Sequence, residues 1–174
     1  MQLDDKMPIR PLTSLPADSD LCALRSSADF WDAYSTPLGD ISLTPLAIAQ
    51  HTFGKTPAWV NALLHLRDRL IALVGIRTVG AMTIDPSKPL AAYRVGDKLA
   101  IFNIFTLSDR EIVLGINDTH LDVRVALIKP ADAPGTYVTA TVVKTHNWLG
   151  RLYMVPVARV HPIIVKAMMR KARL

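Results

Sequence analysis

Four strand-like runs in close succession, followed by one long helix, constrain the fold of this chain more than any other feature. The runs are predicted at 98–107, 111–118, 120–129 and 136–146, and the helix begins near Asn147. Turn-forming residues at 108–110 and 117–119 join the first three runs, and short connections favour antiparallel neighbours. This order predicts an α+β domain in which a curved antiparallel sheet wraps around a long C-terminal helix. A gap between sheet and helix would form a binding site.

The residues before the sheet predict a first strand and two short helices. The strand is expected at 29–35. Thr44 with Pro45, and Thr56 with Pro57, each offer a capping hydroxyl followed by a proline suited to a first helical turn. The second helix is expected to carry an apolar stripe and to end at Gly75. The stripe consists of Trp59, Leu63, Leu66, Leu70 and Val74. We expect an N-terminal arm at 1–14 and a single domain at 15–174.

The terminal helix has an apolar face and a basic face. The apolar face is expected to hold Val160, Ile163, Ile164, Ala167 and Met168, and the basic face Lys166, Arg170 and Lys171. Pro156 cannot donate a hydrogen bond to the carbonyl of Leu152, so a kink or break is expected there.

Composition excludes several classes of protein. Half of the 174 residues are hydrophobic and 20% are charged, which is typical of a soluble globular chain large enough to need no disulfide or metal. The single cysteine, Cys22, and the lack of zinc-like spacings predict neither a disulfide nor a metal site. No phosphate-binding glycine motif indicates a cofactor.

Targeting and partner signals are equally sparse. The acidic N-terminus and the short apolar runs predict a cytoplasmic protein with no signal peptide and no transmembrane segment. The net charge is +5, but aromatic residues make up only 6% of the chain and do not alternate with Lys or Arg on any predicted strand. A nucleic-acid partner is therefore not expected.

The third predicted strand carries three polar residues on one face. His120, Asp122 and Arg124 alternate with apolar residues, so all three project to the same side. One interpretation is a polar group inside a pocket, where Asp122 orients His120 for acid/base work. The other interpretation is a solvent-exposed face with weak cross-strand ion pairs.

Further polar residues are expected near the rim of an apolar pocket. On the fourth strand, Lys144 and His146 share a side with Val138, Ala140 and Val142, and Asp118 follows an apolar set on the second strand. Small-molecule sites favour such a mixture. Alternatively, Asn147 is the N-cap of the helix and His146 contacts only backbone there. The catalytic candidates are Asp118, His120, Asp122 and His146, and the ligand-binding candidates add Arg124, Lys144 and Asn147.

Several segments together resemble the bacterial domain-of-unknown-function family 2867. They are GKTPAWV at 54–60, VGDK at 95–98, VLGINDTHLDVR at 113–124, THNWLGRLY at 145–153 and HPIIV at 161–165. The family looks like a branch of the helix-grip superfamily, which includes lipid-transfer domains, pollen allergens and polyketide cyclases. The resemblance implies a curved antiparallel sheet that grips the C-terminal helix, with two small helices completing it.

Three functions are compatible with this resemblance. The first is binding of a small, apolar or lipid-like molecule between sheet and helix. The second is a cyclase, dehydratase or isomerase that uses acid/base residues at the cavity rim. The third is an interaction domain for a reductase-like partner, because members of the family also occur fused behind a dinucleotide-binding reductase-like domain.

Overall fold

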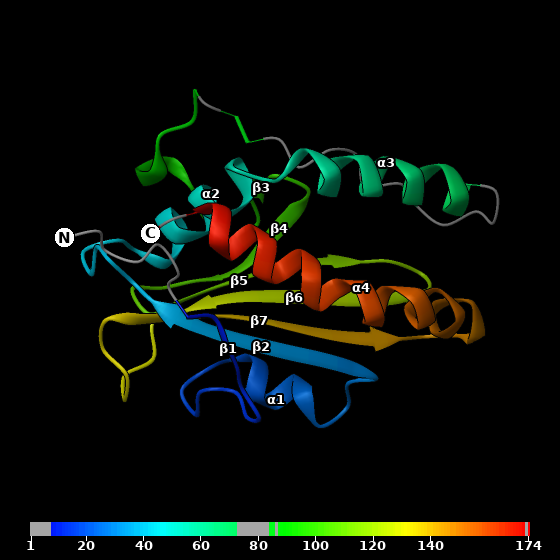
Figure 1. Cartoon of the computed structure of the whole chain (residues 1–174), viewed down its shortest axis with the longest axis horizontal. Coiled ribbons are helices and arrows are strands. Elements are labelled where there is room, and N and C mark those ends of the chain that lie inside the picture. The colour runs from blue at the N-terminus through cyan, green and yellow to red at the C-terminus, as the bar shows by residue number, and fades with distance from the viewer. Residues whose placement is uncertain (1–7, 73–83, 86, 173) are drawn as a thin grey trace.

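The computed structural model describes residues 8–72, 84–85, 87–172 and 174, and it forms one sheet with helices on both sides (Figure 1). In chain order the elements are β1 (Arg10–Pro11), α1 (Leu21–Arg25), β2 (Phe30–Pro37), α2 (Pro45–Gly54), α3 (Ala58–Ala72), η1 (Leu90–Ala92), β3 (Lys98–Leu99), β4 (Phe102–Leu107), β5 (Glu111–Asn117), β6 (Leu121–Ile128), β7 (Thr136–Thr145) and α4 (Trp148–Ala172).

The sheet has seven antiparallel strands in the order β1-β2-β7-β6-β5-β4-β3. It is curved, and α4 lies along one side of it, which confirms the predicted α+β class (Figure 1). The expected strand at 29–35 is β2, which pairs with β7. The run at 98–107 is two strands rather than one, because the chain reverses at Ala100, whose φ is 53°.

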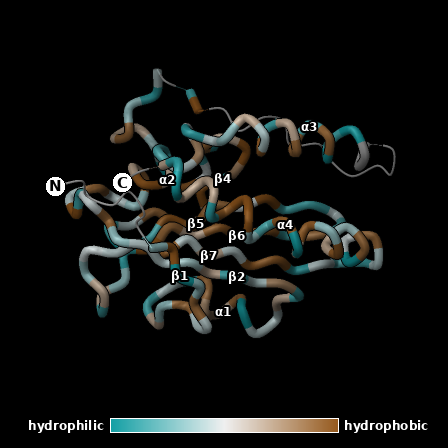
Figure 2. The backbone as a smooth tube through the Cα atoms, in the orientation of Figure 1, coloured by the Kyte–Doolittle hydropathy of each residue, from teal (hydrophilic) through white to brown (hydrophobic). Residues whose placement is uncertain are grey.

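Both faces of the sheet are covered by other parts of the chain. We call the face toward α2 and α4 the inner face; its core includes Ile112, Leu114 and Leu127. We call the opposite face the outer face; Ala126, Val138 and Ala140 pack there against a layer that holds Leu12, Leu15 and Leu21. The central strands β5 and β7 are therefore buried along most of their length, and apolar residues predominate in β5 (Figure 2).

The outer core contains one buried carboxylate. Glu111 is only 4% exposed. It accepts hydrogen bonds from the Ser19 hydroxyl, at 2.6 Å, and from the Asp20 backbone N–H, at 2.9 Å. Burial raises the pKa of Glu111 above its ordinary value of 4.5, although these two hydrogen bonds act in the opposite direction.

The raised pKa of Glu111 has a testable effect on stability. The folded protein holds this proton more tightly than the unfolded chain does, so the contribution of Glu111 to stability falls as the pH rises from about 4.5 through the folded pKa. Glu111→Gln does not titrate. We expect the stability of the wild type relative to this variant to improve as the pH is lowered from 7 toward 4.5. Urea unfolding of both proteins across this range measures the difference, and a difference that stayed constant would contradict the prediction.

The two helix starts differ from each other. The hydroxyl of Thr44 accepts a hydrogen bond from the N–H of Ala47 at 3.2 Å, with Pro45 at the first helical position, as predicted. Thr56 does not repeat this arrangement. Its hydroxyl donates backward to the carbonyl of Phe53 at 2.6 Å, and the carbonyl of Pro57 accepts the first hydrogen bond of α3. Helix α3 therefore begins one residue later, at Ala58.

The apolar stripe of α3 does not mark a closely packed face. Trp59 and Leu66 are 46% and 52% exposed, whereas Val60, outside the predicted stripe, is buried. Leu63 and Leu66 instead border a cleft beneath the helix. Val74 and Gly75, which end the predicted stripe, lie outside the described residues, and the described part of Leu70 is its helical backbone.

Helix α4 is continuous over 25 residues, so of the expected kink or break at Pro156 the break is wrong, and the kink stays a prediction. A proline removes one hydrogen bond, and packing of Met154, Val165 and Met168 against the rest of the domain holds the helix on both sides of it. Its inner face holds Val160, Ile164 and Met168, as predicted, but Ile163 is 60% exposed. Ile163 lies on the opposite side because the inner face is centred between residues 161 and 164.

By length and composition alone, α4 could also cross a membrane. Its most apolar window of 18 residues has a mean hydropathy of 1.3, and 22% of that window is buried in the domain. A long helix of a protein core meets the same criteria. The predicted absence of a transmembrane segment therefore stays a prediction.

Candidate functional site

The polar residues of the third and fourth predicted strands meet on the outer face, near one end of β6 and β7. Asp122 lies opposite Lys144 in the register of the two strands. Its carboxylate contacts Nε2 of His146 at 3.1 Å rather than the ring of His120. Asp122 is paired with β7 across the strands, and this cross-strand placement brings its carboxylate close to His146. Both side chains of this pair are more than 30% exposed.

His120 and Asn147 join the β5–β6 turn to the start of α4. The side-chain oxygen of Asn147 accepts the N–H of Gly150 at 3.1 Å, which makes Asn147 the N-cap of the helix. Its amide also lies 3.0 Å from Nδ1 of His120. Asp118 accepts the N–H of Thr119 at 2.7 Å within the turn. These contacts hold the turn and the helix end together.

The remaining predicted residues take part in local contacts on the same face. The guanidinium of Arg124 covers the ring of Phe105 at 3.8 Å and donates to the side chain of Asn117 at 2.7 Å. Lys144 lies 4.0 Å from the carboxylate of Asp29. That carboxylate accepts the N–H and hydroxyl of Thr145, and these hydrogen bonds lower the pKa of Asp29. A role of these residues in ligand binding or catalysis stays a prediction.

A separate apolar cleft lies on the inner face of the sheet. It has a volume of about 430 Å³ and is enclosed by the sheet, α3 and α4. Its walls include Phe30, Val123, Val125 and Val143 from the strands, Leu63 and Leu64 from α3, and Val157, Val160, Ile164 and Met168 from α4. The seven residues predicted for ligand binding do not line it, because those on the strands project to the outer face and the others lie at the turn and helix cap.

A contact between a histidine and a carboxylate borders this cleft between β2 and α4. Nδ1 of His161 lies 2.8 Å from Oδ2 of Asp32, and the two side chains are only 20% and 12% exposed. The hydroxyl of Tyr34 donates to the same carboxylate oxygen at 3.3 Å. Burial, reinforced by the Asp32 charge, raises the pKa of Tyr34 to about 12, so the phenol stays protonated at neutral pH.

Two buried polar atoms without partners lie in the wall of the cleft or next to residues that line it. Within the described residues, Oδ1 of Asp32 and the hydroxyl of Thr139 are buried and make no hydrogen bond. Thr139 lines the cleft, and so does Thr141, which pairs with Asp32 across the strands. A buried polar group usually has a partner, so these atoms indicate a place where a polar group of a ligand could bind.

A second polar contact lies where α3 approaches α4. Nε of Arg67 donates to the hydroxyl of Tyr153 at 2.7 Å, and both residues line the cleft. Arg67 also pairs with its neighbour Asp68 at 2.9 Å. The two helices are thus linked at this end of the cleft by a charged hydrogen bond.

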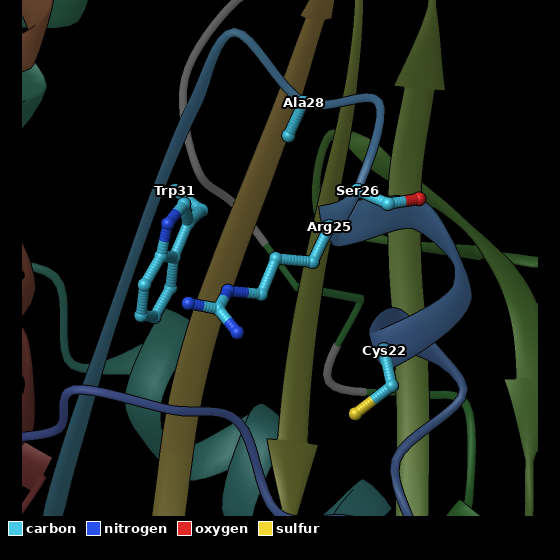
Figure 3. Close-up of a pocket in the computed structure, with 5 residues that line it drawn as sticks. All are labelled: Cys22, Arg25, Ser26, Ala28 and Trp31. Atoms are coloured by element: carbon cyan, nitrogen blue, oxygen red, sulfur yellow. The ribbon is translucent and has the colours of Figure 1, made fainter.

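A smaller depression of about 350 Å³ lies beside α1. It is lined by Cys22, Arg25, Ser26, Ala28 and Trp31 (Figure 3). The guanidinium of Arg25 extends toward the Trp31 ring and covers it at 4.2 Å. The guanidinium of Arg25 and the face of the Trp31 ring are thus already partners of each other in a cation–π contact. The thiol of Cys22 donates to the carbonyl of Pro16 at 3.1 Å.

Asp32 and His161 were not among the residues predicted for the site, although the sequence holds a signal for each. Asp32 alternates with Phe30 and Tyr34, so it shares their side of a strand. His161 lies between Val157 and Val165, four residues from each, in the middle of an apolar helix face. A polar residue at the centre of an apolar face is the observation that points to a functional role.

The fold and the cleft define an α+β domain whose sheet and C-terminal helix enclose an apolar site with few polar groups. Within the described residues, no cluster of three or more metal-binding side chains accompanies it. The chain belongs to the family described as "Protein of unknown function (DUF2867)", whose model matches residues 24–168. No match was found among the curated proteins or among the solved structures.

Proposed function

We propose that this domain binds a small, largely apolar molecule in the inner cleft. The observation that carries the proposal is the cleft itself: about 430 Å³, walled by aliphatic and aromatic side chains from the sheet, α3 and α4. Small-molecule sites in proteins typically have volumes of about 300–1,000 Å³ and mostly apolar walls with a few polar groups. The cleft meets both criteria.

The resemblance to the helix-grip superfamily supports the same proposal. In that arrangement the bound molecule lies between a curved sheet and the C-terminal helix, and the cleft of this domain lies in the same place. We propose membership of that superfamily on the same grounds. A cytoplasmic location is proposed from the single cysteine, which suits a reducing compartment. An interaction with a reductase-like partner is a separate proposal that rests on the fused relatives alone.

Titration with the neutral apolar fluorophore N-phenyl-1-naphthylamine tests the binding function. We expect saturable binding to one site, with a rise in emission and a shift to shorter wavelength as the probe leaves water. Protein unfolded in urea serves as the control, because the cleft exists only in the folded domain. A signal that rises linearly without saturation in the folded protein would contradict the proposal.

A further inference from the structure

The contact between Asp32 and His161 fixes which nitrogen of the imidazole is free. Nδ1 of His161 faces the carboxylate at 2.8 Å, so a neutral ring carries its proton on Nδ1 and donates it to Asp32. Nε2 then bears a lone pair, and within the described residues it has no hydrogen-bond partner. Because His161 lines the cleft, this basic nitrogen is available to a bound molecule.

The surroundings of His161 keep the ring in one orientation. The rings of His161 and Phe30 meet edge to face, with centroids 5.6 Å apart and an interplanar angle of 84°. The phenol of Tyr34 donates to Oδ2 of Asp32, the same carboxylate oxygen that faces the imidazole. From α4, Lys166 lies over the Tyr34 ring at 5.0 Å, and Arg67 of α3 lines another part of the cleft. A base held by a carboxylate in this way is the usual arrangement for proton transfer.

We propose that Asp32 and His161 form an acid/base pair that moves a proton on an apolar carbonyl compound bound in the cleft. This inference rests on the binding function proposed above. Nε2 removes a proton from the carbon next to the carbonyl group: the C–H bond breaks, its electron pair forms a C=C bond, and the carbonyl π pair moves to oxygen. In a β,γ-unsaturated ketone the imidazolium then returns the proton to the γ-carbon, the C=C bond moves into conjugation with the carbonyl group, and the electron pair on oxygen re-forms the carbonyl π bond. No oxidant or reductant is consumed, so the reaction class is isomerisation.

The hydroxyl of Thr139 suits the oxygen of that intermediate. It is buried, it lacks a partner within the described residues, and its residue lines the cleft on the inner face of β7. A hydrogen-bond donor aimed at the developing negative charge stabilises the transition state more than the ground state. A carbonyl compound would also supply the acceptor that this hydroxyl lacks, which favours this class over a plain hydrocarbon.

Deuterium exchange into 2-tetralone tests the proposal without knowledge of the natural substrate. This bicyclic ketone is mostly apolar, and proton NMR in deuterated buffer follows the loss of its α-protons. General base catalysis typically contributes about 10²–10⁴-fold to a rate. We expect the wild type to accelerate exchange at least about 100-fold over buffer, His161→Gln to lose that acceleration, and Asp32→Asn to lose about ten-fold or more, because its ring is no longer held in the basic tautomer.

The controls separate proton transfer from a purely structural link between β2 and α4. His51→Gln removes an exposed imidazole on α2 and should exchange at the wild-type rate. N-phenyl-1-naphthylamine should inhibit exchange by the wild type, and nitrogen NMR of the wild type should show the Nδ1–H form of His161. These two measurements need no variant, so they decide the matter even if His161→Gln fails to fold.

Each outcome has a distinct meaning. If the wild type binds the fluorophore but exchanges no faster than buffer, or if His161→Gln exchanges as fast as the wild type, the acid/base pair is refuted and the binding function stands. If the fluorophore does not bind, the proposed binding function is refuted, and the acid/base proposal that rests on it falls with it. Exchange that the fluorophore does not inhibit would place the reaction outside the cleft and overturn the inference.

Discussion

Replacing Gly150 with alanine is expected to lower the free energy of unfolding by about 3 kcal/mol, which is a large share of the stability of a domain of this size. Gly150 is buried in the first turn of α4. A Cβ atom at this position would overlap the carbonyl oxygen of His120 and lie 3.4 Å from Cβ of Thr145. The oxygen belongs to backbone that also accepts the N–H of His146 at 2.9 Å, so it cannot move without breaking the link between turn and helix.

Gly54→Ala is the matched control for this substitution. Gly54 is the last residue of α2, and a Cβ there would meet only the side chain of Ile84 at 3.6 Å, an ordinary contact. We expect this variant to unfold within about 1 kcal/mol of the wild type, since alanine favours a helix over glycine by about that amount. Urea unfolding measures both changes. Equal stability of the two variants would show that α4 does not pack against the β5–β6 turn as described.

Filling the cleft from α4 is expected to abolish most of the binding of an apolar probe. Ile164 lines the cleft, and a tryptophan there would occupy the space between the helix and the sheet. We expect Ile164→Trp to weaken binding of N-phenyl-1-naphthylamine at least about ten-fold, which corresponds to about 1.4 kcal/mol of binding free energy. Fluorescence titration measures the loss, and thermal unfolding shows whether the variant is folded.

Ile163→Trp adds the same volume one residue away. Ile163 is 60% exposed on the opposite side of α4, so the larger ring extends into solvent and the cleft keeps its volume. Its affinity for the probe should therefore equal that of the wild type. Equal weakening by both substitutions would mean that the probe binds to the outside of the helix and not in the cleft.

The order of the elements could be predicted because each depends on local pattern. Alternation and turn residues mark β5, β6 and β7, and Thr44 with Pro45 marks the start of α2, since these signals act over only a few residues. Ala100 shows the limit of such patterns: an apolar residue inside an apolar run adopts a positive φ and divides β3 from β4. The reversal depends on pairing between the two strands, which a single run does not reveal.

The placement of the candidate site could not be predicted for a different reason. The alternation of side chains along a strand shows which residues share a side of it, but it does not show which side faces the terminal helix. Here both faces of the sheet are apolar, because Leu12, Leu15 and Leu21 cover the outer one. Val138, Ala140 and Val142 therefore face the N-terminal layer and not α4, and Lys144 lies on the same outer side.

The contact between Asp32 and His161 depends on the packing of distant parts of the chain against each other. Asp32 and His161 are 129 residues apart in sequence, and they meet only because α4 lies against the inner face beside β2. Each residue alone looks like an isolated polar side chain in an apolar pattern. The contact between the two side chains can be recognised only when the positions of the strand and the helix are known.

A crystal structure of the wild type with 1-bromonaphthalene tests the central claim most directly, because anomalous scattering from bromine locates the probe. We predict a bromine peak between the sheet and α4, in contact with side chains such as Val123, Val143 and Ile164. A cleft closed by repacked side chains, with bromine elsewhere or absent, would contradict the account.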